Sequence, residues 1–226
     1  MIHDACLNAY GKGLFPEIVV PVKKAGDVYV AELFHGQTAA FKDMALSLLP
    51  YLMTLSLKQL KEEREVMILA ATSGDTGKAA LEGFKDVEGT CIKVFYPLDG
   101  VSAIQQQQMV SQTGKNVKVV GIHGNFDDAQ SAVKKLLHLK NWKLQVINIM
   151  FSYHLQIQSM SDVDSSNRLL FHSYFELVRN NEIKLGDKIN FCVPSGNFGN
   201  CLAGYFAKKW VYQLINLFVL QIKIIF

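Results

Sequence analysis

Length, composition and charge exclude several classes of protein. The chain has 226 residues, half of them hydrophobic, which is enough to bury the core of one domain or of two small lobes. The 23 basic and 20 acidic residues give a net charge of +3 and form no basic run, so we expect no nucleic-acid partner. The four cysteines lack CxxC spacing, which favours reduced thiols in the cytoplasm over a metal site or disulfides.

Targeting and membrane segments are not expected either. The first ten residues, MIHDACLNAY, lack a basic start followed by an apolar run, so they do not resemble a signal peptide. No segment reaches the roughly 18 consecutive apolar residues that a membrane helix needs. We therefore expect neither a leader nor a membrane partner.

Strand and helix patterns alternate along the chain, which indicates an α/β fold with a mostly parallel sheet. In chain order they predict strand Val28–Leu33, helix Asp43–Leu60, strand Glu65–Ala71, helix Thr76–Phe84, strand Cys91–Tyr96, helix Val101–Gln112, strand Val117–Gly121, helix Asn125–Leu139, helix Leu169–Arg179, strand Lys188–Val193 and helix Phe198–Lys208. Ligands of such sheets collect where strands end and loops lead into helices. Three of these loops have an unusual composition.

The first loop, ELFHGQTAAFKD, carries one lysine, Lys42, between Phe41 and a predicted helix start. Burial and the positive end of a helix both disfavour the ammonium form of a lysine there. A neutral amine can form an imine with an aldehyde cofactor. The residues alone leave a surface lysine near a helix start as the alternative.

The second and third loops are rich in glycine and small polar residues. ATSGDTG, residues 71–77, has backbone N–H groups suited to a carboxylate or phosphate, although an ordinary capped helix start is the alternative. PSGNFGN, residues 194–200, has two glycines that let the backbone approach a phosphate. It matches neither the Walker pattern nor GxGxxG.

Together the three loops resemble threonine synthase in sequence, order and spacing. ELFHGQTAAFKD is similar to the family's segment around the lysine that binds pyridoxal 5′-phosphate (PLP). ATSGDTGKAAL is similar to its substrate and cofactor loop, and SGNFGN followed by LAGYFAKK to its PLP-phosphate loop. The resemblance covers about 20–137 and 175–209, and implies fold type II of the PLP enzymes (tryptophan synthase beta-like).

The resemblance also implies the reaction and the roles of the site residues. The family converts O-phospho-L-homoserine and water to L-threonine and phosphate, with PLP held as a Schiff base on Lys42, which then moves protons on the substrate. Asp75 stands where related enzymes put an Asn beside the cofactor's phenolic oxygen. His35 and Thr38 would contact substrate or serve a structural role. The remaining implied residues hold the substrate carboxylate (Ser73, Gly74, Thr76, Gly77) and the PLP phosphate (Gly196, Asn197, Phe198, Gly199, Asn200).

The chain departs from the family in length and in two segments. It is about half as long as expected, so we predict a partial fold type II core at 1–209, with a small βα lobe at about 65–125. Where the family continues Met-Gly-Leu-Pro-Ile after Lys209, this chain reads WVYQLIN, and stepping the codons back by one base permits the family wording. Similar steps apply at 154–160 and 166–171. We therefore expect about 140–172 and the tail 210–226 to be out of frame, with a divergent isoform as the alternative.

These departures separate the family function from the activity of this chain. Wrong residues in a core cost a few kcal/mol each, against a total stability of about 5–15 kcal/mol. We therefore expect an insoluble or weakly PLP-binding chain without turnover. The alternatives are another fold type II enzyme, such as a serine or threonine dehydratase, and a non-catalytic PLP-binding remnant.

Overall fold

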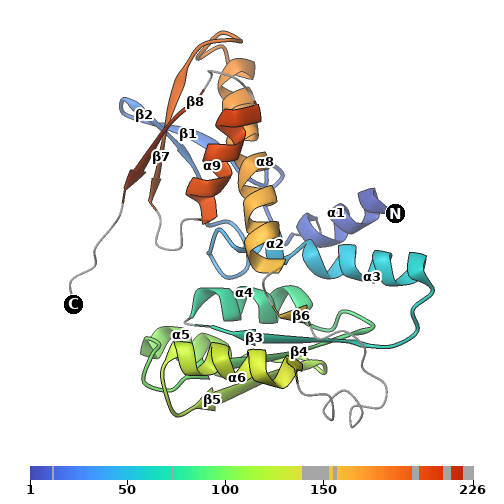
Figure 1. Ribbon diagram of the computed structural model, residues 1–226. Helices are drawn as coiled ribbons and strands as arrows, with labels where there is room; N and C mark the ends of the chain where they lie inside the picture. The colour runs from blue at the N-terminus through green and yellow to red at the C-terminus, as the bar shows by residue number, and fades with distance from the viewer. Residues whose placement is uncertain are drawn as a thin grey trace. The chain divides into compact units, whose positions relative to one another are not determined.

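The computed structural model describes residues 1–11, 13–72, 74–138, 153–154, 157–194, 199–210 and 215–220 (Figure 1). The chain divides into two units. Unit 1 comprises Met1–Val19 and Leu33–Ile157, and unit 2 comprises Val20–Glu32 and Gln158–Phe226. Strands and helices alternate in both, which confirms the predicted α/β class.

Unit 1 is built on a parallel sheet with the strand order β5-β4-β3-β6. β3 (Val66–Ala71) pairs with β4 (Thr90–Pro97) and with β6 (Tyr153–His154), and β4 pairs with β5 (Val117–Ile122). The three strands predicted within residues 65–121 are confirmed, while the short β6 has no counterpart among the predictions. Because the pairs are parallel, the loops after β3 and β4 leave the sheet at the same edge.

Helices cover both faces of this sheet (Figure 1). On one face, α4 (Asp75–Phe84) and α5 (Ala103–Val110) pack in a cluster that includes Ile68, Ala70, Leu81, Phe84 and Met109. On the other face, α6 (Phe126–His138) places Val133 against Met67 and Leu69. Successive side chains of a strand point to opposite faces, so β3 is apolar at every position because both of its faces are covered.

The helix predicted at Asp43–Leu60 is wrong as one element, because the structure has α2 (Asp43–Leu46) and α3 (Leu49–Leu60) instead. Pro50 lies in the first turn of α3. A proline has no N–H to donate to the carbonyl four residues earlier, which here belongs to Leu46, and its ring would clash with that carbonyl. An additional helix, α1 (Ile2–Tyr10), packs on α3, and the Tyr10 hydroxyl donates a 2.5 Å hydrogen bond to the Met44 carbonyl.

Unit 2 contains a hairpin, two helices and a parallel strand pair. The predicted strand at Val28 is β2 (Val28–Ala31), which pairs antiparallel with β1 (Val22–Ala25). The predicted helix at Leu169 is the last part of α8 (Ile157–Arg179). β7 (Ile189–Pro194) and α9 (Gly199–Trp210) confirm the predicted strand and helix around the third loop. β8 (Ile215–Leu220) lies within the tail that we expect to be out of frame, and pairs parallel with β7.

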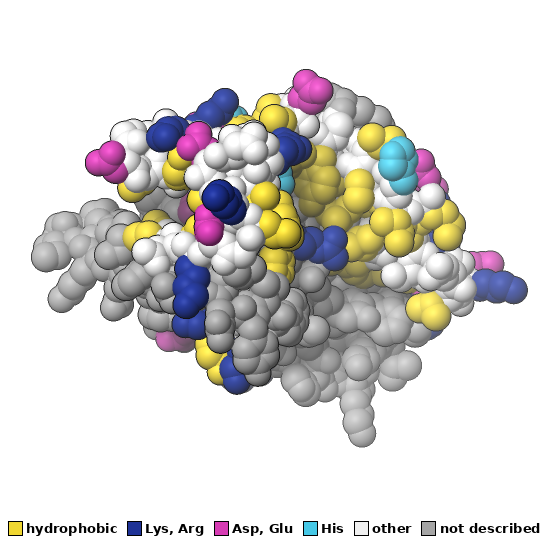
Figure 2. All heavy atoms as spheres, turned by 90° about the horizontal axis from the view of Figure 1, so that it is seen from above, with side chains coloured by type: hydrophobic (Ala, Val, Ile, Leu, Met, Phe, Trp, Pro, Cys, Tyr) yellow, Lys and Arg dark blue, Asp and Glu magenta, His cyan; other side chains and the backbone are white. Residues whose placement is uncertain are grey.

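The surface and the side-chain inventory add three observations. On the face drawn in Figure 2, the Lys and Arg side chains of the described residues lie apart, among acidic, apolar and uncharged ones. The described residues contain neither a cluster of His, Cys, Asp and Glu suited to a metal ion nor a helix apolar and long enough to cross a membrane. The four cysteines, Cys6, Cys91, Cys192 and Cys201, are free thiols.

Candidate active site

Lys42 lies at the start of α2 with its side chain buried. The residue is 9% exposed, so it is not the surface lysine of the alternative interpretation. Its Nζ donates a hydrogen bond to Oγ1 of Thr76, in the first turn of α4, and lies 5.6 Å from the centre of the Phe41 ring. Buried lysines are normally paired with an acid. None of the ion pairs within the described part of the chain includes Lys42.

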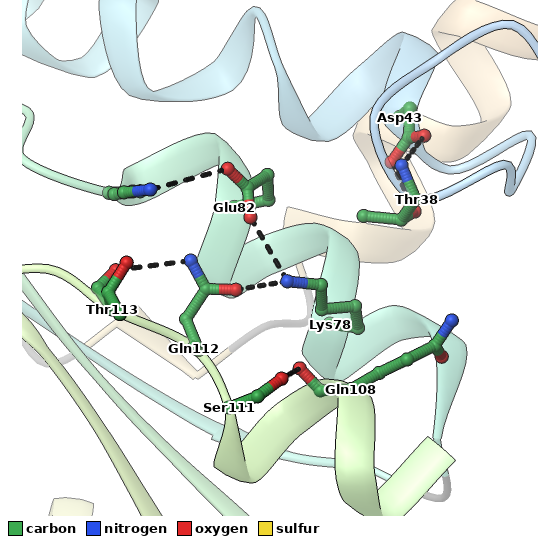
Figure 3. Close-up of polar contacts among 9 residues, drawn as sticks. Thr38, Asp43, Lys78, Glu82, Gln108, Ser111, Gln112 and Thr113 are labelled. Carbon is green, nitrogen blue, oxygen red and sulfur yellow. Dashed lines mark hydrogen bonds and ion pairs between the residues drawn. The ribbon is translucent and has the colours of Figure 1, made fainter. Parts of the chain in front are cut away.

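The loop that precedes Lys42 is held by the buried carboxylate of Asp43. Thr38 donates two hydrogen bonds to it, from its backbone N at 2.8 Å and from Oγ1 at 2.6 Å (Figure 3). The carboxylate also packs on Gly36, where an added Cβ would lie 2.4 Å from Oδ2. Between these contacts, Ala39 has a φ of 56°, which is unfavourable for a residue with a Cβ. Asp43 therefore constrains the loop, and Thr38 has a structural contact.

α2 approaches α4 closely through a glycine. An ideal Cβ on Gly83 would lie 2.0 Å from the Leu46 carbonyl oxygen and 2.8 Å from the carbonyl carbon. This carbonyl ends α2, at the point where Pro50 cannot supply a hydrogen-bond donor. Only a residue without a side chain allows such an approach. The close approach of the two helices brings Lys42 to Thr76.

The β3–α4 loop is organised by the hydroxyl of Thr72, which is 2% exposed. Thr72 Oγ1 accepts hydrogen bonds from the backbone N–H groups of Gly74 at 3.0 Å and of Gly77 at 2.9 Å. Gly74 has a φ of +143°, a conformation that favours glycine, and a Cβ on Gly77 would lie 2.4 Å from Thr72 Cγ2. The two N–H groups expected to hold a substrate carboxylate therefore point to Thr72 in this structure.

Asp75 is the exposed first residue of α4, and it is tied to the next loop of the sheet. Its Oδ1 accepts a 2.8 Å hydrogen bond from Nε2 of Gln105, in the first turn of α5. Gln105 also closes a capping box with Ser102. The carboxylate predicted to lie beside the cofactor thus has a fixed neighbour from a different loop.

A second polar contact joins α4 to the end of α5 (Figure 3). Lys78 Nζ lies 3.0 Å from Glu82 Oε2 and donates to Gln112 Oε1, while Gln112 Nε2 donates to the Thr113 carbonyl at 3.2 Å. Partial burial works against the charged form of Glu82, but hydrogen bonds from Lys78 and Gln112 and the nearby positive charges hold its pKa below the ordinary value. Asp75 and Lys78 are three residues apart, so both contacts lie on one side of α4.

The third loop belongs to unit 2, and only its ends are described. Pro194 ends β7, and Gly199 and Asn200 are the first two residues of α9, both half-buried. A Cβ on Gly199 would meet no atom within 4 Å. Three predicted phosphate ligands, Gly196, Asn197 and Phe198, lie outside the described residues, as does Ser73 of the second loop.

Three residues of the site, Thr72, Ser102 and Gln105, are not among the predicted site residues, although each had a signal in the sequence. Thr72 stands two residues before a glycine at a strand end, the spacing of a hydroxyl that bonds the backbone two residues on. The Ser-x-x-Gln spacing of Ser102 and Gln105 is a capping-box pattern, which marks a helix start at the same sheet edge. His35, for which the family resemblance implies a substrate contact or a structural role, has its ring centre 4.6 Å from that of Phe34.

Comparison with known proteins gives a consistent result. No family model matches the chain. The chain is similar to "Threonine synthase-like 1" of Homo sapiens, at 32% identity over 218 residues, which are 89% of this chain and 28% of the relative. It is 36% identical over 207 residues to threonine synthase of Pseudomonas aeruginosa, covering 88% of this chain and 41% of the relative.

Solved structures agree with the curated relatives. A crystal structure of PLP-bound threonine synthase from Brucella melitensis matches with a TM-score of 0.74 and 33% identity, covering 96% of this chain and 45% of that one. This chain therefore spans less than half the length of each of these relatives. Because these relatives are 32–36% identical over most of this chain and a solved threonine synthase shares its fold, the chain belongs to the threonine synthase family of fold type II.

Proposed function

We propose that this chain carries the cofactor lysine and the substrate loop of a threonine synthase-type lyase, which uses PLP to convert O-phospho-L-homoserine and water to L-threonine and phosphate. The observation that carries the proposal is the buried Lys42, whose Nζ bonds a hydroxyl of the second loop rather than an acid. When bound, PLP supplies an electron sink for charge on the substrate carbons. Membership of the family supports the same assignment.

The residues of unit 1 fit this cofactor. Lys42 would hold PLP through Nζ, because its side chain is buried and its amine lies within hydrogen-bond reach of the Thr76 hydroxyl in the substrate loop. Asp75 would lie beside the phenolic oxygen. Gly74 has a positive φ that favours glycine, and the amide of Gln105 packs against its backbone beside Asp75.

The substrate and phosphate contacts are proposed from the family motifs. We assign the substrate carboxylate to Ser73, Gly74, Thr76 and Gly77. Since the N–H groups of Gly74 and Gly77 bond Thr72, the hydroxyl of Thr76 is the better supported contact of this loop. We assign the PLP phosphate to residues 196–200, a glycine-containing segment that follows β7 and includes the first two residues of α9.

Covalent capture tests the cofactor lysine. The chain is incubated with PLP, reduced with sodium borohydride and digested, and the modified peptide is identified by mass spectrometry. We expect the label on Lys42, its loss in Lys42→Ala, and its retention in Lys58→Ala, a control at an exposed helix position. Label spread over surface lysines, unchanged by Lys42→Ala, would contradict the proposal.

The substrate class is tested by spectroscopy and product analysis. We expect O-phospho-L-homoserine to change the visible absorbance of the PLP-loaded chain, while serine and threonine do not. Because the chain spans less than half of its relatives, we expect no turnover, and formation of threonine and phosphate by the purified chain would overturn that expectation. Release of a keto acid from serine or threonine would instead indicate a dehydratase.

We also propose that residues at about 140–172 and 210–226 are read out of frame in a damaged or misread gene. The support is that a shift of one base in the reading frame permits codons for family-like sequence in these segments. Nucleotide sequencing of codons 140–175 and 208–212 tests this, and an intact frame without an insertion or deletion contradicts it. The four free thiols support a cytoplasmic location.

A further inference from the structure

Gln105 lies where the β3–α4 loop and the β4–α5 loop contact each other. It is the third residue of α5, and its helix follows β4, the parallel neighbour of β3. Ala71 at the end of β3 pairs with Phe95 near the end of β4, so the β3–α4 and β4–α5 loops leave the sheet side by side. This topology places a half-buried amide against the loop that carries Gly74 and Asp75.

Both ends of the Gln105 amide have assigned partners. Oε1 accepts from Ser102 N at 3.2 Å and from Ser102 Oγ at 3.1 Å, so the capping box fixes the oxygen. The NH2 group is thereby turned outward and donates from Nε2 to Asp75 Oδ1 at 2.8 Å. A Cβ on Gly74 would lie 2.4 Å from Nε2, so the same amide also covers the Gly74 backbone. A glutamine is required here, because the site needs an acceptor and a donor on one planar group.

A second glutamine, Gln112, lies just after the end of α5 and also contacts α4. Gln112 accepts from Lys78 Nζ through Oε1 and donates through Nε2 to the Thr113 carbonyl (Figure 3). The first turn of α4 is therefore attached at two points, through Asp75 to the first turn of α5 and through Lys78 to Gln112, just after the end of α5. Rotation of Asp75 away from its position would break the first contact while the second keeps α4 in place.

We propose that Gln105 is a positioning residue that orients the carboxylate of Asp75 toward the cofactor. The inference rests on the proposed function, in which Asp75 stands where related enzymes have a neutral amide. A carboxylate beside a phenolic oxygen can only accept hydrogen bonds and adds negative charge. Donation by Gln105 Nε2 disperses that charge on Oδ1 and leaves Oδ2 as the oxygen that meets the cofactor.

Three variants of the full chain test this role. Gln105→Leu keeps the size of the side chain but removes both polar atoms, Gln105→Glu places a second acceptor against Asp75, and Gln108→Leu is the control at an exposed position of the same helix. We expect Gln105→Leu to weaken PLP binding about tenfold, the effect of one hydrogen bond to a charged group, and to shift the absorbance maximum of the bound cofactor. The control should match the unsubstituted chain in both.

An inverted pair separates positioning from general stability. Combining Gln105→Glu with Asp75→Asn exchanges donor and acceptor, so we expect PLP affinity and absorbance to return toward the original values although Gln105→Glu alone impairs both. A double-mutant cycle on the thermal midpoint without PLP, using Gln105→Leu and Asp75→Ala, each of which removes one partner, measures the contact itself and should show non-additive effects.

The outcomes distinguish the positioning role of Gln105 from the proposed PLP-dependent function. If the chain captures PLP on Lys42 but Gln105→Leu has unchanged affinity and absorbance, the positioning role is overturned and the proposed function stands. If the inverted pair fails to restore what Gln105→Glu impairs, the role is also overturned. If the unsubstituted chain captures no PLP on Lys42, the proposed function fails and this role falls with it, whereas the coupling between Gln105 and Asp75 without PLP would persist.

Discussion

Gly83→Ala tests the helix contact that carries Lys42 toward Thr76. The added Cβ would lie 2.0 Å from the Leu46 carbonyl oxygen, more than 1 Å inside ordinary contact distances of about 3.5 Å. The obstructing atom belongs to the backbone, so no side-chain rotation relieves the clash. Overpacking of this kind costs about 1–3 kcal/mol, while alanine gains about 1 kcal/mol of helix propensity over glycine. Because a backbone atom cannot turn aside, the upper value of about 3 kcal/mol applies, and we expect a net loss of about 2 kcal/mol.

The effect is measured by thermal unfolding followed by far-ultraviolet circular dichroism. For a chain of this size, a loss of about 2 kcal/mol corresponds to a midpoint lower by about 4–8 °C. Gly199→Ala serves as a stability control, because its Cβ would meet no atom within 4 Å at the start of a helix. We also expect slower borohydride-trapped PLP capture by Gly83→Ala, since α2 must move away from α4. An unfolding midpoint at or above that of the unsubstituted chain would refute the close packing of α2 on α4.

Three further predictions concern the loop, the acid response and the thiols. Thr72→Val should destabilise the chain by about 1–3 kcal/mol, because the buried Gly74 N–H loses its acceptor, and Thr72→Ser should restore most of the stability in the same melt. The pKa of Glu82 is lowered on folding, so its ionised carboxylate stabilises the fold above its ordinary pKa of 4.5, and this stabilisation is lost as pH falls through the folded pKa. Glu82→Gln should therefore make the melting temperature fall less steeply below about pH 4.5 than in the unsubstituted chain. An unchanged slope would contradict this prediction. Burial and the charge of Glu65 raise the pKa of the Cys91 thiol to about 11. Iodoacetamide should therefore label Cys91 at least about tenfold more slowly than the exposed Cys192, as measured by mass spectrometry. Equal labelling rates would show that Cys91 is accessible as a thiolate.

Local sequence was informative where a pattern depends on neighbours along the chain. The run VMILAA predicts a fully buried strand, and β3 is covered on both faces. The helix at residues 43–60 was predicted as continuous because its apolar spacing continues through Pro50. The proline instead separates α2 from α3, and the Leu46 carbonyl at the end of α2 packs against Gly83 of α4.

In the candidate site, too, some features were predictable from local sequence and others depend on contacts between distant segments. Three motifs in order were sufficient to predict the family and the chemical role of Lys42, which remains a prediction for this chain. The placement of Thr72 between two backbone N–H groups was not predicted, because the turn geometry depends on φ values that no residue count supplies. The contact between Asp75 and Gln105 joins residues 30 apart in sequence, and it exists because β3 and β4 are parallel neighbours.

The amino-acid sequence by itself determined the fold class and the family, because periodicity and short motifs are local properties of a chain, and it supplied site residues that stay predictions. Only the tertiary structure decided that the Lys42 amine is buried against Thr76, that Gly83 admits a carbonyl of α2, and that Gln105 meets Asp75. These contacts depend on how strands pair and how closely helices approach, and those are set by packing between segments distant in sequence.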